Sequence, residues 1–426
     1  MKRAADISWN EALSLVPPGQ LLYSIRPARA ERPCEWQRDV RTALRQPTGT
    51  PALDQMVGAD EKVVVLADDV TRPTPQQQVL PPLLTALNEA GVPDRHITVI
   101  VALGTHRYMT RAEMREHFGE ETCARVNVIN HAWKDPDTFV DLGVTPRGTP
   151  LKVNRVAHDA DVLIGVGSIV PHIYAGWGGG GKIVMPGICS AESIGPVHSL
   201  SAEGGGLLYV AGRSGTACRQ EIEEAAAQVG LDFILNVVLD AEGTGAWVGA
   251  GHPVQAHAAG VAAAEKIFVR DIPAPADIAI VDARPAVIEY WQGIKALGHA
   301  ARGIRKGGTA ILVGDFPEGI ETTHPEFSSY ALCSEEEIVR AWETGRIADH
   351  VAVAPLRLHA LARAHCDVIC VSSGMSVEDK ERLGFRHAAS IGEALELALA
   401  RHSRAACIGV IEFGGDVVPK VAAASP

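Results

Sequence analysis

A short segment near residue 70 brings carboxylate, hydroxyl and guanidinium groups together. Asp69, Thr71 and Arg72 follow the apolar run Lys62–Leu66, and flanking prolines restrict the backbone of this segment. An arginine held in this way can bind a carboxylate or a phosphate through two parallel hydrogen bonds. The alternative is an ordinary helix N-terminus, with acidic capping side chains and an arginine in a surface ion pair.

A histidine follows the next apolar run. His106 lies in Gly104–Arg107, directly after Ile97–Leu103, which is expected to form a strand. Ligands bind beyond the carboxyl ends of strands in open α/β sheets, and imidazole exchanges protons near neutral pH. His106 is therefore a candidate general acid or base, and a structural histidine is the alternative.

The segment Pro171–Lys182 is the richest in groups that could carry chemistry. Glycines expose backbone N–H groups that can surround a phosphate. Lys182 can add a positive charge or act as a nucleophile, and His172 and the later His198 can exchange protons or bind a metal. Five glycines fall within six residues of this segment: Gly176, Gly178, Gly179, Gly180 and Gly181.

This glycine run matches two nucleotide-binding patterns only in form. Gly176–Lys182 satisfies GxxxxGK, but Ile183 stands where a nucleotide triphosphatase needs Ser or Thr to hold magnesium. The same glycines satisfy GxGxxG, but Pro186 and Gly187 interrupt the helix that should follow. A P-loop-like nucleotide hydrolase is therefore kept only as an alternative.

An amide and an ammonium group share one face of an expected helix in the second half of the chain. Gln292 and Lys295 are three residues apart in the helical pattern Gln292–Ala301, so they are neighbours on its surface. Such a pair suits a carboxylate with a neighbouring hydroxyl group. An amphipathic helix with solvated ends is the alternative.

Short β-branched runs alternate with helical patterns along most of the chain. This alternation predicts parallel sheets with helices on both faces. Thr110 and Glu113 form a capping box that opens one helix. The other elements expected in the first half are strands Lys62–Leu66, Ile97–Leu103, Val126–Ile129 and Val162–Val166, and helices Gln76–Glu89, Glu221–Val229 and Ala256–Phe268.

A second α/β series is expected after Asp271–Pro275, whose two prolines disfavour both helix and strand pairing. Ser334 with Glu337 should cap one of its helices. The strands expected in this series are Asp277–Val281, Thr309–Val313, Val368–Val371 and Ala406–Ile411.

Composition and charge narrow the class of protein. The 426 residues, 46% hydrophobic and 21% charged, suit two ordinary globular domains. A formal net charge of −12 without basic blocks argues against nucleic-acid binding. The eight cysteines form no CxxC pair, which disfavours a zinc ribbon. Met1–Asp6 precedes no apolar stretch and no run is long enough to span a bilayer, so we expect a cytoplasmic protein that binds no membrane.

Taken together, these motifs resemble those of the lactate racemase family, whose members use a nickel-pincer nucleotide. They occur in the family's order with similar gaps, from about residue 60 to about residue 300, and Val410–Gly415 resembles the family's closing strand and turn. The matching pieces are Asp69-x-Thr71-Arg72-Pro73, Gly104–Arg107, His172–Lys182, Pro186-Gly187, His198 and Gln292-x-x-Lys295.

The resemblance implies two α/β domains with the active site in the cleft between them. The expected domains are a cofactor-binding domain over residues 1–271, rejoined by about 404–426, and a C-terminal domain over residues 272–403. It also implies a pyridinium mononucleotide whose two sulfur atoms and one ring carbon hold nickel. His198 matches the nickel ligand, and Lys182 matches a lysine that can attach the cofactor covalently.

The remaining site residues follow from the same resemblance. His106 and His172 match the family's two proton-handling histidines. Trp291 stands where the lactate enzymes commonly have tyrosine, which changes the pocket size and removes a hydroxyl group. Cofactor contacts are expected from Asp69, Thr71 and Gly178–Gly181, and substrate contacts from Arg72, Trp291, Gln292 and Lys295.

The implied reaction is inversion of C2 in a 2-hydroxy acid, lactate or a related acid. The α-hydrogen of a carboxylate is very weakly acidic, so its transfer as hydride, through a 2-keto acid, avoids a carbanion. That scheme needs one base for each orientation of the hydroxyl group, and imidazole titrates in the right range. Expected partners are the small substrate and the proteins of cofactor biosynthesis. A non-catalytic carrier of the nickel-pincer nucleotide is a further alternative.

Overall fold

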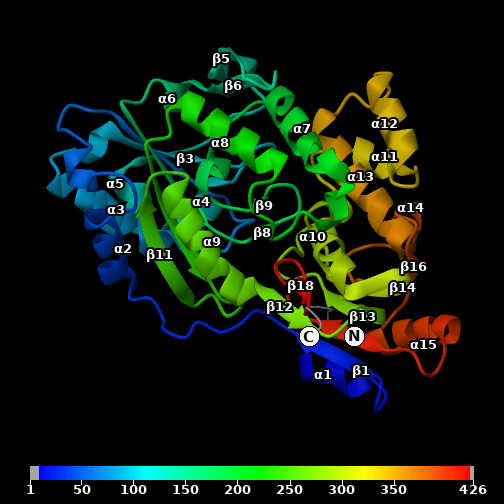
Figure 1. Ribbon diagram of the computed structural model, residues 1–426. Helices are drawn as coiled ribbons and strands as arrows, with labels where there is room; N and C mark the ends of the chain where they lie inside the picture. The colour runs from blue at the N-terminus through cyan, green and yellow to red at the C-terminus, as the bar shows by residue number, and fades with distance from the viewer. Residues whose placement is uncertain (1–8, 423–426) are drawn as a thin grey trace.

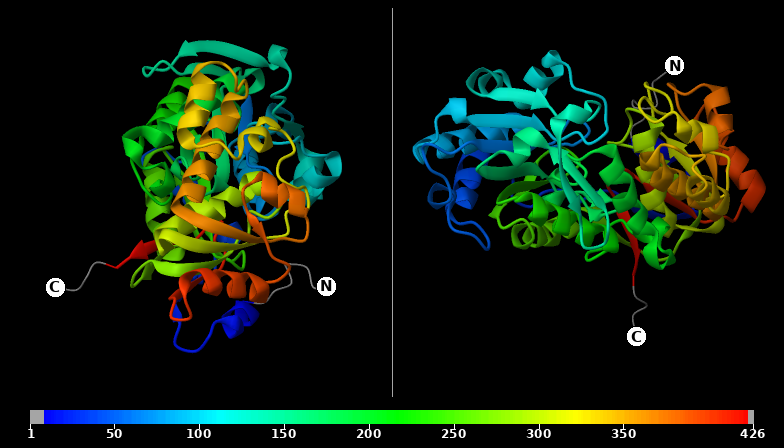
Figure 2. Two further views of the ribbon diagram at one scale, coloured as in Figure 1. Left: turned by 90° about the vertical axis from the view of Figure 1, so that its right-hand side faces the viewer. Right: turned by 90° about the horizontal axis from the view of Figure 1, so that it is seen from above.

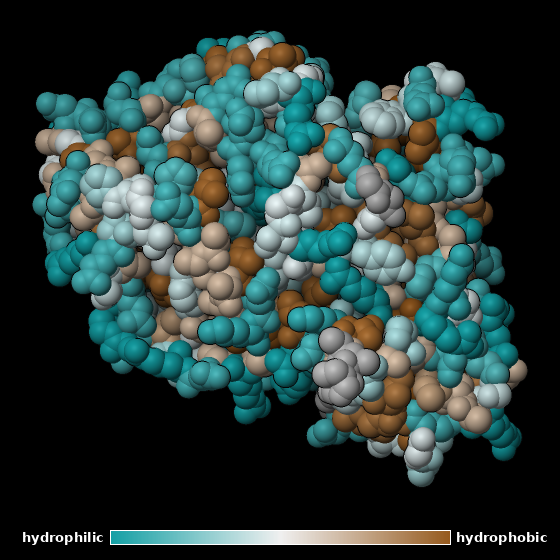
Figure 3. Space-filling model, in the orientation of Figure 1, coloured by the Kyte–Doolittle hydropathy of each residue, from teal (hydrophilic) through white to brown (hydrophobic). Residues whose placement is uncertain are grey.

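The computed structural model describes residues 9–422 of the chain. Three predictions fall partly or wholly outside the described residues: the segment Met1–Asp6, the start of the predicted domain 1–271 and the end of the predicted segment 404–426. Two six-stranded sheets form two lobes that lie side by side, as Figures 1 and 2 show. In the space-filling view a notch separates the lobes, and hydrophilic side chains cover most of the visible face (Figure 3). The α/β class with parallel-type sheets is confirmed.

The first sheet has the order β11-β10-β7-β2-β3-β4, and only β11 runs antiparallel to its neighbour. Alternate residues of β2 pack into two different cores, Val63 and Val65 on one face and Val64 and Leu66 on the other. Because both faces are covered, the strand is apolar throughout. The strands are β2 (Val63–Ala67), β3 (Ile97–Val101), β4 (Asn127–Asn130), β7 (Val162–Ser168), β10 (Phe233–Leu239) and β11 (Gly245–Gly251).

The helices of this lobe include the capping box predicted at Thr110, whose hydroxyl accepts the Glu113 N–H. Two short hairpins complete the lobe, β5 (Phe139–Val144) with β6 (Pro150–Asn154) and β8 (Pro171–His172) with β9 (Gly176–Trp177). The helices are α2 (Trp36–Arg45), α3 (Gln76–Glu89), α4 (Arg111–Phe118), α5 (Glu120–Arg125), α6 (Arg155–His158), α7 (Ala191–Ser199), α8 (Ala217–Val229) and α9 (Gln255–Phe268).

The second sheet is parallel throughout, in the order β1-β17-β13-β14-β15-β16. The capping box predicted at Ser334 is present at the start of α12. The strands are β1 (Leu21–Ile25), β13 (Ala276–Asp282), β14 (Ile304–Val313), β15 (Cys366–Val371), β16 (Arg386–His387) and β17 (Ile408–Ile411). The helices are α1 (Trp9–Leu15), α10 (Tyr290–Ala300), α11 (Glu326–Tyr330), α12 (Glu335–Glu343), α13 (His350–His365), α14 (Val377–Arg382) and α15 (Ile391–His402).

Both ends of the described chain lie in the second lobe, which corrects the predicted course of residues 1–271 and 404–426. Strand β17 lies between β1 and β13 instead of joining the first sheet. Tyr23 of β1 packs over Gly409 of β17, where a Cβ would come within 2.1 Å of the tyrosine ring, and its hydroxyl donates to the Gly303 carbonyl at 2.5 Å. This close approach holds β1 on the second sheet.

The expected break at Asp271–Pro275 is also only partly right. Strand β12 (Val269–Ile272) reaches into it and pairs in parallel with β18 (Val418–Val421). The prolines follow the paired residues and so do not remove a hydrogen-bond donor from them. All eight cysteines are free thiols. Among residues 9–422, no helix combines the length and the apolar character needed to cross a bilayer.

Candidate active site

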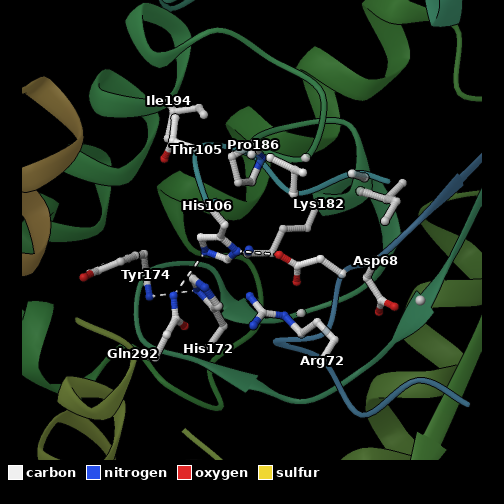
Figure 4. A pocket seen from close by; sticks show the side chains of 18 of the residues that line it. Asp68, Arg72, Thr105, His106, His172, Tyr174, Lys182, Pro186, Ile194 and Gln292 are labelled. Atoms are coloured by element: carbon white, nitrogen blue, oxygen red, sulfur yellow. Dashed lines mark hydrogen bonds and ion pairs between the residues drawn. The ribbon is translucent and has the colours of Figure 1, made fainter. Parts of the chain in front are cut away.

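The carboxyl ends of strands of the first sheet face a cavity between the lobes. The loops after β2, β3 and β7 approach it from the first lobe, and helix α10 approaches from the second. The cavity encloses about 990 Å³, part of it open to solvent. We call it the main cavity. His106, His172, Arg72 and Gln292 converge in it (Figure 4).

His106 lies between a carboxylate and an amide. Its Nδ1 is 2.7 Å from Asp69 Oδ2, and its Nε2 is 3.1 Å from Gln292 Nε2. Burial alone would raise the pKa of Asp69, but His106, Arg72 and Thr71 outweigh it and hold that pKa well below its usual range. The ionised carboxylate keeps the ring proton on Nδ1, so Nε2 presents a lone pair toward Gln292. His106 is therefore arranged to accept a proton.

His172 has the opposite arrangement. Its Nδ1 accepts the backbone N–H groups of Tyr174 and Ala175, each at 3.2 Å. A nitrogen that accepts two hydrogen bonds carries no proton, so the proton of the neutral ring is on Nε2. Burial, and then the charges of Lys182 and Arg72, hold the pKa of His172 well below its usual value. His172 is therefore a neutral ring that donates through Nε2.

Two cations lie beside this pair. Arg72 donates to Thr71 Oγ1 at 3.1 Å, and no carboxylate among the described residues lies within ion-pair distance of its guanidinium. Lys295 donates to Gln292 Oε1 at 2.5 Å, which orients the amide so that its N–H₂ faces His106. Burial, and then the charge of Arg72, lower the pKa of Lys295 to about 7. An anion bound between Arg72 and Lys295 would stabilise the positive charges of both side chains.

The glycine run forms a tight turn instead of a P-loop. After β9 the chain makes a single 3₁₀ turn at Gly180–Ile183, and the next helix starts only at Ala191. A Cβ at Gly176, whose φ is +78°, would lie 1.8 Å from the Arg213 carbonyl oxygen, so only glycine fits there. A strand–loop–helix phosphate site is thus absent from this segment, and the nucleotide-hydrolase alternative loses its structural basis.

Buried polar side chains from neighbouring elements hold this turn in place. Asn236 Oδ1 of β10 accepts the Gly180 N–H at 2.8 Å. Arg219 of α8 donates to the carbonyl oxygens of Gly179 and Trp177. Asn236 and Arg219 were not predicted from the sequence, because neither lies in a recognisable motif.

Lys182 and His198 are the two groups of the main cavity best suited to hold a cofactor. Burial, and then the charges of Arg72 and Lys295, hold the pKa of Lys182 well below its usual value, which favours the nucleophilic neutral amine. Both ring nitrogens of His198 are shielded from solvent and have no hydrogen-bond partner among the described residues. Burial lowers the pKa of His198 to about 3, so the ring is neutral, as a metal ligand must be.

Trp291 forms one wall of the main cavity, supported from behind by a histidine that was not predicted. The Trp291 and His324 rings stack with their centroids 4.4 Å apart. His324 Nδ1 is 2.6 Å from Asp349 Oδ2, and its Nε2 is 3.1 Å from Thr105 Oγ1. Since Thr105 lies in the first lobe and His324 in the second, this chain of side chains connects the lobes beside the cavity.

The structure brings together most of the predicted site residues. Asp69 and Thr71, which are expected at the cofactor, contact His106 and Arg72; Asp69 lines the main cavity and Thr71 does not. Gly180 and Gly181, which begin the 3₁₀ turn that contains Lys182, are not part of its lining. The predicted residues that do line it are Asp69, Arg72, His106, His172, Gly178, Gly179, Lys182, His198, Trp291, Gln292 and Lys295.

Comparisons with known proteins agree with this arrangement. A family model described as the lactate racemase N-terminal domain matches residues 10–205. A lactate racemase of Lactiplantibacillus plantarum is 30% identical over 398 residues, which cover 90% of this chain and 91% of the relative. A lactate racemase of Thermoanaerobacterium thermosaccharolyticum is 27% identical, with 89% of each chain covered.

Solved structures give the same result for the fold. The lactate racemase apoprotein of T. thermosaccharolyticum superposes with a TM-score of 0.85 at 25% identity, covering 95% of this chain and 96% of that one. A Thermotoga maritima protein shares the fold, with a TM-score of 0.73 at 19% identity over 93% of this chain and 100% of that one.

Fold and cleft together define a two-lobed α/β isomerase of the racemase type. The chain belongs to the lactate racemase family.

Proposed function

We propose that this racemase inverts C2 of a 2-hydroxy acid with the help of a nickel-pincer nucleotide. One observation carries the proposal. The proton-handling pair His106 and His172 shares a single cavity with the cations Arg72 and Lys295 and with the orphaned imidazole of His198. Curated relatives of this chain are named lactate racemase, so lactate is the first substrate to test.

The residues present fit the proposed cofactor. Lys182 would attach it, His198 would bind its nickel, and the N–H group of Gly179 would face its phosphate. Within residues 9–422, no group of three His, Cys, Asp or Glu side chains could hold a metal ion, so His198 would act together with donor atoms of the cofactor itself. When bound, the cofactor would supply an electrophilic centre suited to reversible hydride transfer.

The substrate carboxylate would bind between Arg72 and Lys295. Both side chains line the main cavity, and burial, followed by the charge of Arg72, lowers the pKa of Lys295. A carboxylate between them provides charge-assisted hydrogen bonds and restores the full charge of Lys295. Gln292, already bonded to Lys295 and facing His106, would fix the hydroxyl group relative to the carboxylate.

Proton movement would begin at His106. Its Nε2 lone pair accepts the hydroxyl proton, and Asp69 stabilises the imidazolium that results. His172 donates a hydrogen bond from Nε2 to the substrate oxygen on its own side. To act as a base, His172 must move its proton to Nδ1 and break the bonds from the Tyr174 and Ala175 amides. The two histidines are therefore not equivalent in the free enzyme.

The cofactor is tested first. The protein is produced in a host that makes the nickel-pincer nucleotide, and its intact mass and nickel content are measured. A mass increase equal to the nucleotide, with one nickel per chain, supports the proposal. An unmodified, nickel-free protein contradicts it, provided that a known family member made in parallel is loaded.

Variants then separate the roles. His198→Ala should lose nickel while keeping the organic cofactor, and Lys182→Ala should lose covalent attachment. His106→Ala and His172→Ala should keep cofactor and nickel but lose inversion, as followed by chiral chromatography. A loaded wild-type enzyme that leaves every chiral 2-hydroxy acid unchanged would point to the non-catalytic carrier instead.

A further inference from the structure

A second cavity lies directly behind the substrate-binding groups. It encloses about 680 Å³, part of it open to solvent, within the size range of roughly 300–1,000 Å³ usual for small-molecule sites. Arg72, His172, Gln292 and Lys295 line both this cavity and the main cavity, so they form the partition between the two. We call it the rear chamber. Three of these four side chains lie on the side of the main cavity away from Ile194 and Thr105 (Figure 4).

None of the groups suited to hold the cofactor lines the rear chamber. Lys182, His198, Gly178 and Gly179 face only the main cavity. The rear chamber instead has a largely apolar lining, and its only cations among the described residues are Arg72 and Lys295 of the partition. Its apolar walls are built by Val70, Val170, Pro285, Ala286 and Ile288.

Backbone contacts tie the walls of the chamber together. The turn after β17 donates from Gly414 N–H to the Asp282 carbonyl at 2.7 Å and from Gly415 N–H to the Arg284 carbonyl at 3.0 Å. A Cβ at Gly415 would lie 2.9 Å from the Ala283 carbonyl oxygen, so the turn is pressed against the loop after β13. This contact fixes the wall at Ala286.

One carboxylate faces the chamber. Asp416 is the only acidic residue in its described lining, and burial raises its pKa to about 6, although Lys295 and Arg72 oppose the rise. Near neutral pH the Asp416 side chain is therefore ionised in most molecules of the protein. A substrate whose first carboxylate already occupies Arg72 and Lys295 would place a second carboxylate against Asp416, which is unfavourable.

We propose that the rear chamber receives the C2 substituent of the substrate and selects 2-hydroxy acids with an apolar substituent longer than the methyl group of lactate. This inference rests on the proposed function. When the substrate carboxylate is held at the partition, C2 lies next to the rear chamber. The rear chamber is then the apolar space available to the C2 substituent, because the groups that would hold the cofactor lie on the other side. The class selected is that of branched aliphatic or aryl 2-hydroxy acids, and dicarboxylates such as malate are disfavoured.

The test compares three substrates on the nickel-loaded enzyme: lactate, 2-hydroxy-4-methylpentanoate and malate. The wild-type enzyme should favour the branched acid over lactate by about tenfold to a hundredfold in kcat/KM, the range that a few buried methylene groups provide. Ala286→Phe, which fills the chamber, should lower kcat/KM at least about tenfold for the branched acid and leave lactate within about threefold. Ala389→Phe, at an exposed position before α15, is the matched control.

Two further variants keep the test decisive if Ala286→Phe does not fold. Ile288→Ala, which enlarges the chamber, should raise the activity on 3-phenyl-2-hydroxypropanoate relative to that on the branched acid. Asp416→Asn should raise kcat/KM for malate.

The outcomes separate this inference from the proposed function. If Ala286→Phe lowers kcat/KM equally for lactate and the branched acid, the chamber serves only as an entry path for substrates. If no variant changes kcat/KM selectively for one substrate, the chamber does not determine specificity. Either result overturns this inference, whereas turnover of lactate in the same experiments still supports the proposed racemase function. A nickel-loaded wild type that turns over none of the acids refutes both.

Discussion

Replacing Asp69 by asparagine tests how the site keeps His106 ready to accept a proton. The carboxylate faces His106 Nδ1 across 2.7 Å and holds the ring proton there. The asparagine side chain would present either its oxygen or its N–H₂ group to this nitrogen. In the second orientation the proton moves to Nε2, and the lone pair that should accept the hydroxyl proton is lost.

The expected loss follows from the energy of this one contact. A hydrogen bond to a charged group contributes about 1.5–3 kcal/mol. If that stabilisation is needed in the transition state, where His106 becomes positive, kcat/KM falls by roughly 10- to 150-fold. KM should change little, because Arg72 and Lys295 are untouched. The two enantiomers of a substrate have equal free energies, so kcat/KM must fall by the same factor for both.

Chiral chromatography of each enantiomer, with nickel content measured on the same preparation, checks Asp69→Asn. The control is Asp232→Asn, because the Asp232 carboxylate also accepts a hydrogen bond, from the Leu163 N–H, but lies away from the cavity. A fully loaded Asp69→Asn enzyme with activity within about twofold of wild type would refute the reasoning. So would an equal loss in the control.

Three further predictions follow from the structure. Burial, and then the charge of Arg72, lower the pKa of Lys295 to about 7, so the side chain loses its positive charge above that pH. KM of the wild-type enzyme should therefore rise from pH 7 to 9, and Lys295→Arg should abolish this rise. A wild-type KM that stays constant over this range would contradict the prediction. Burial lowers the pKa of His359 to about 3. Below pH 6.5 this histidine is therefore protonated in the unfolded chain but stays neutral in the native protein, and the free energy of unfolding falls by about 1.4 kcal/mol for each unit that the pH decreases. His359→Gln should therefore flatten the decline in urea-unfolding free energy between pH 6.5 and 4, and an unchanged slope would exclude this group as its source. Gly409→Ala should cost about 1–3 kcal/mol because its Cβ would overlap the Tyr23 ring, whereas Gly392→Ala, with nothing nearer than 3.8 Å, should be neutral or slightly stabilising in thermal unfolding.

Local patterns predicted the elements that carry the site with good accuracy. Helix α3 has the predicted bounds, Gln76–Glu89, and the capping boxes at Thr110 and Ser334 are both present. These features depend on residues a few positions apart, so a short stretch of sequence contains the physical cause of each. Helix α13 and strands β10 and β11 were missed. Helix α13 is buried on several sides and contains Pro355, so it has no clear apolar stripe.

Motif spacing also identified which residues share the cleft. His106, His172, Lys182, His198 and Lys295 all line the main cavity, as the family's pattern predicted. The partners that tune them were not predicted. Asn236, Arg219, His324 and Asp416 come from distant parts of the chain and lie in no motif, so only the fold brings them to the site.

The sequence by itself determined the class of the fold and many of its strands and helices, which follow from residue types and short-range periodicity. The side chains proposed for racemisation came from the resemblance of its motifs to those of a known family. The tertiary structure decided which sheet receives β1 and β17, which nitrogen of His106 and His172 carries the proton, and that a rear chamber lies behind Arg72 and Lys295. Each of these depends on contacts between residues far apart in the chain. Pairing partners, buried charges and cavities arise only when separate elements pack together, so no local pattern contains them.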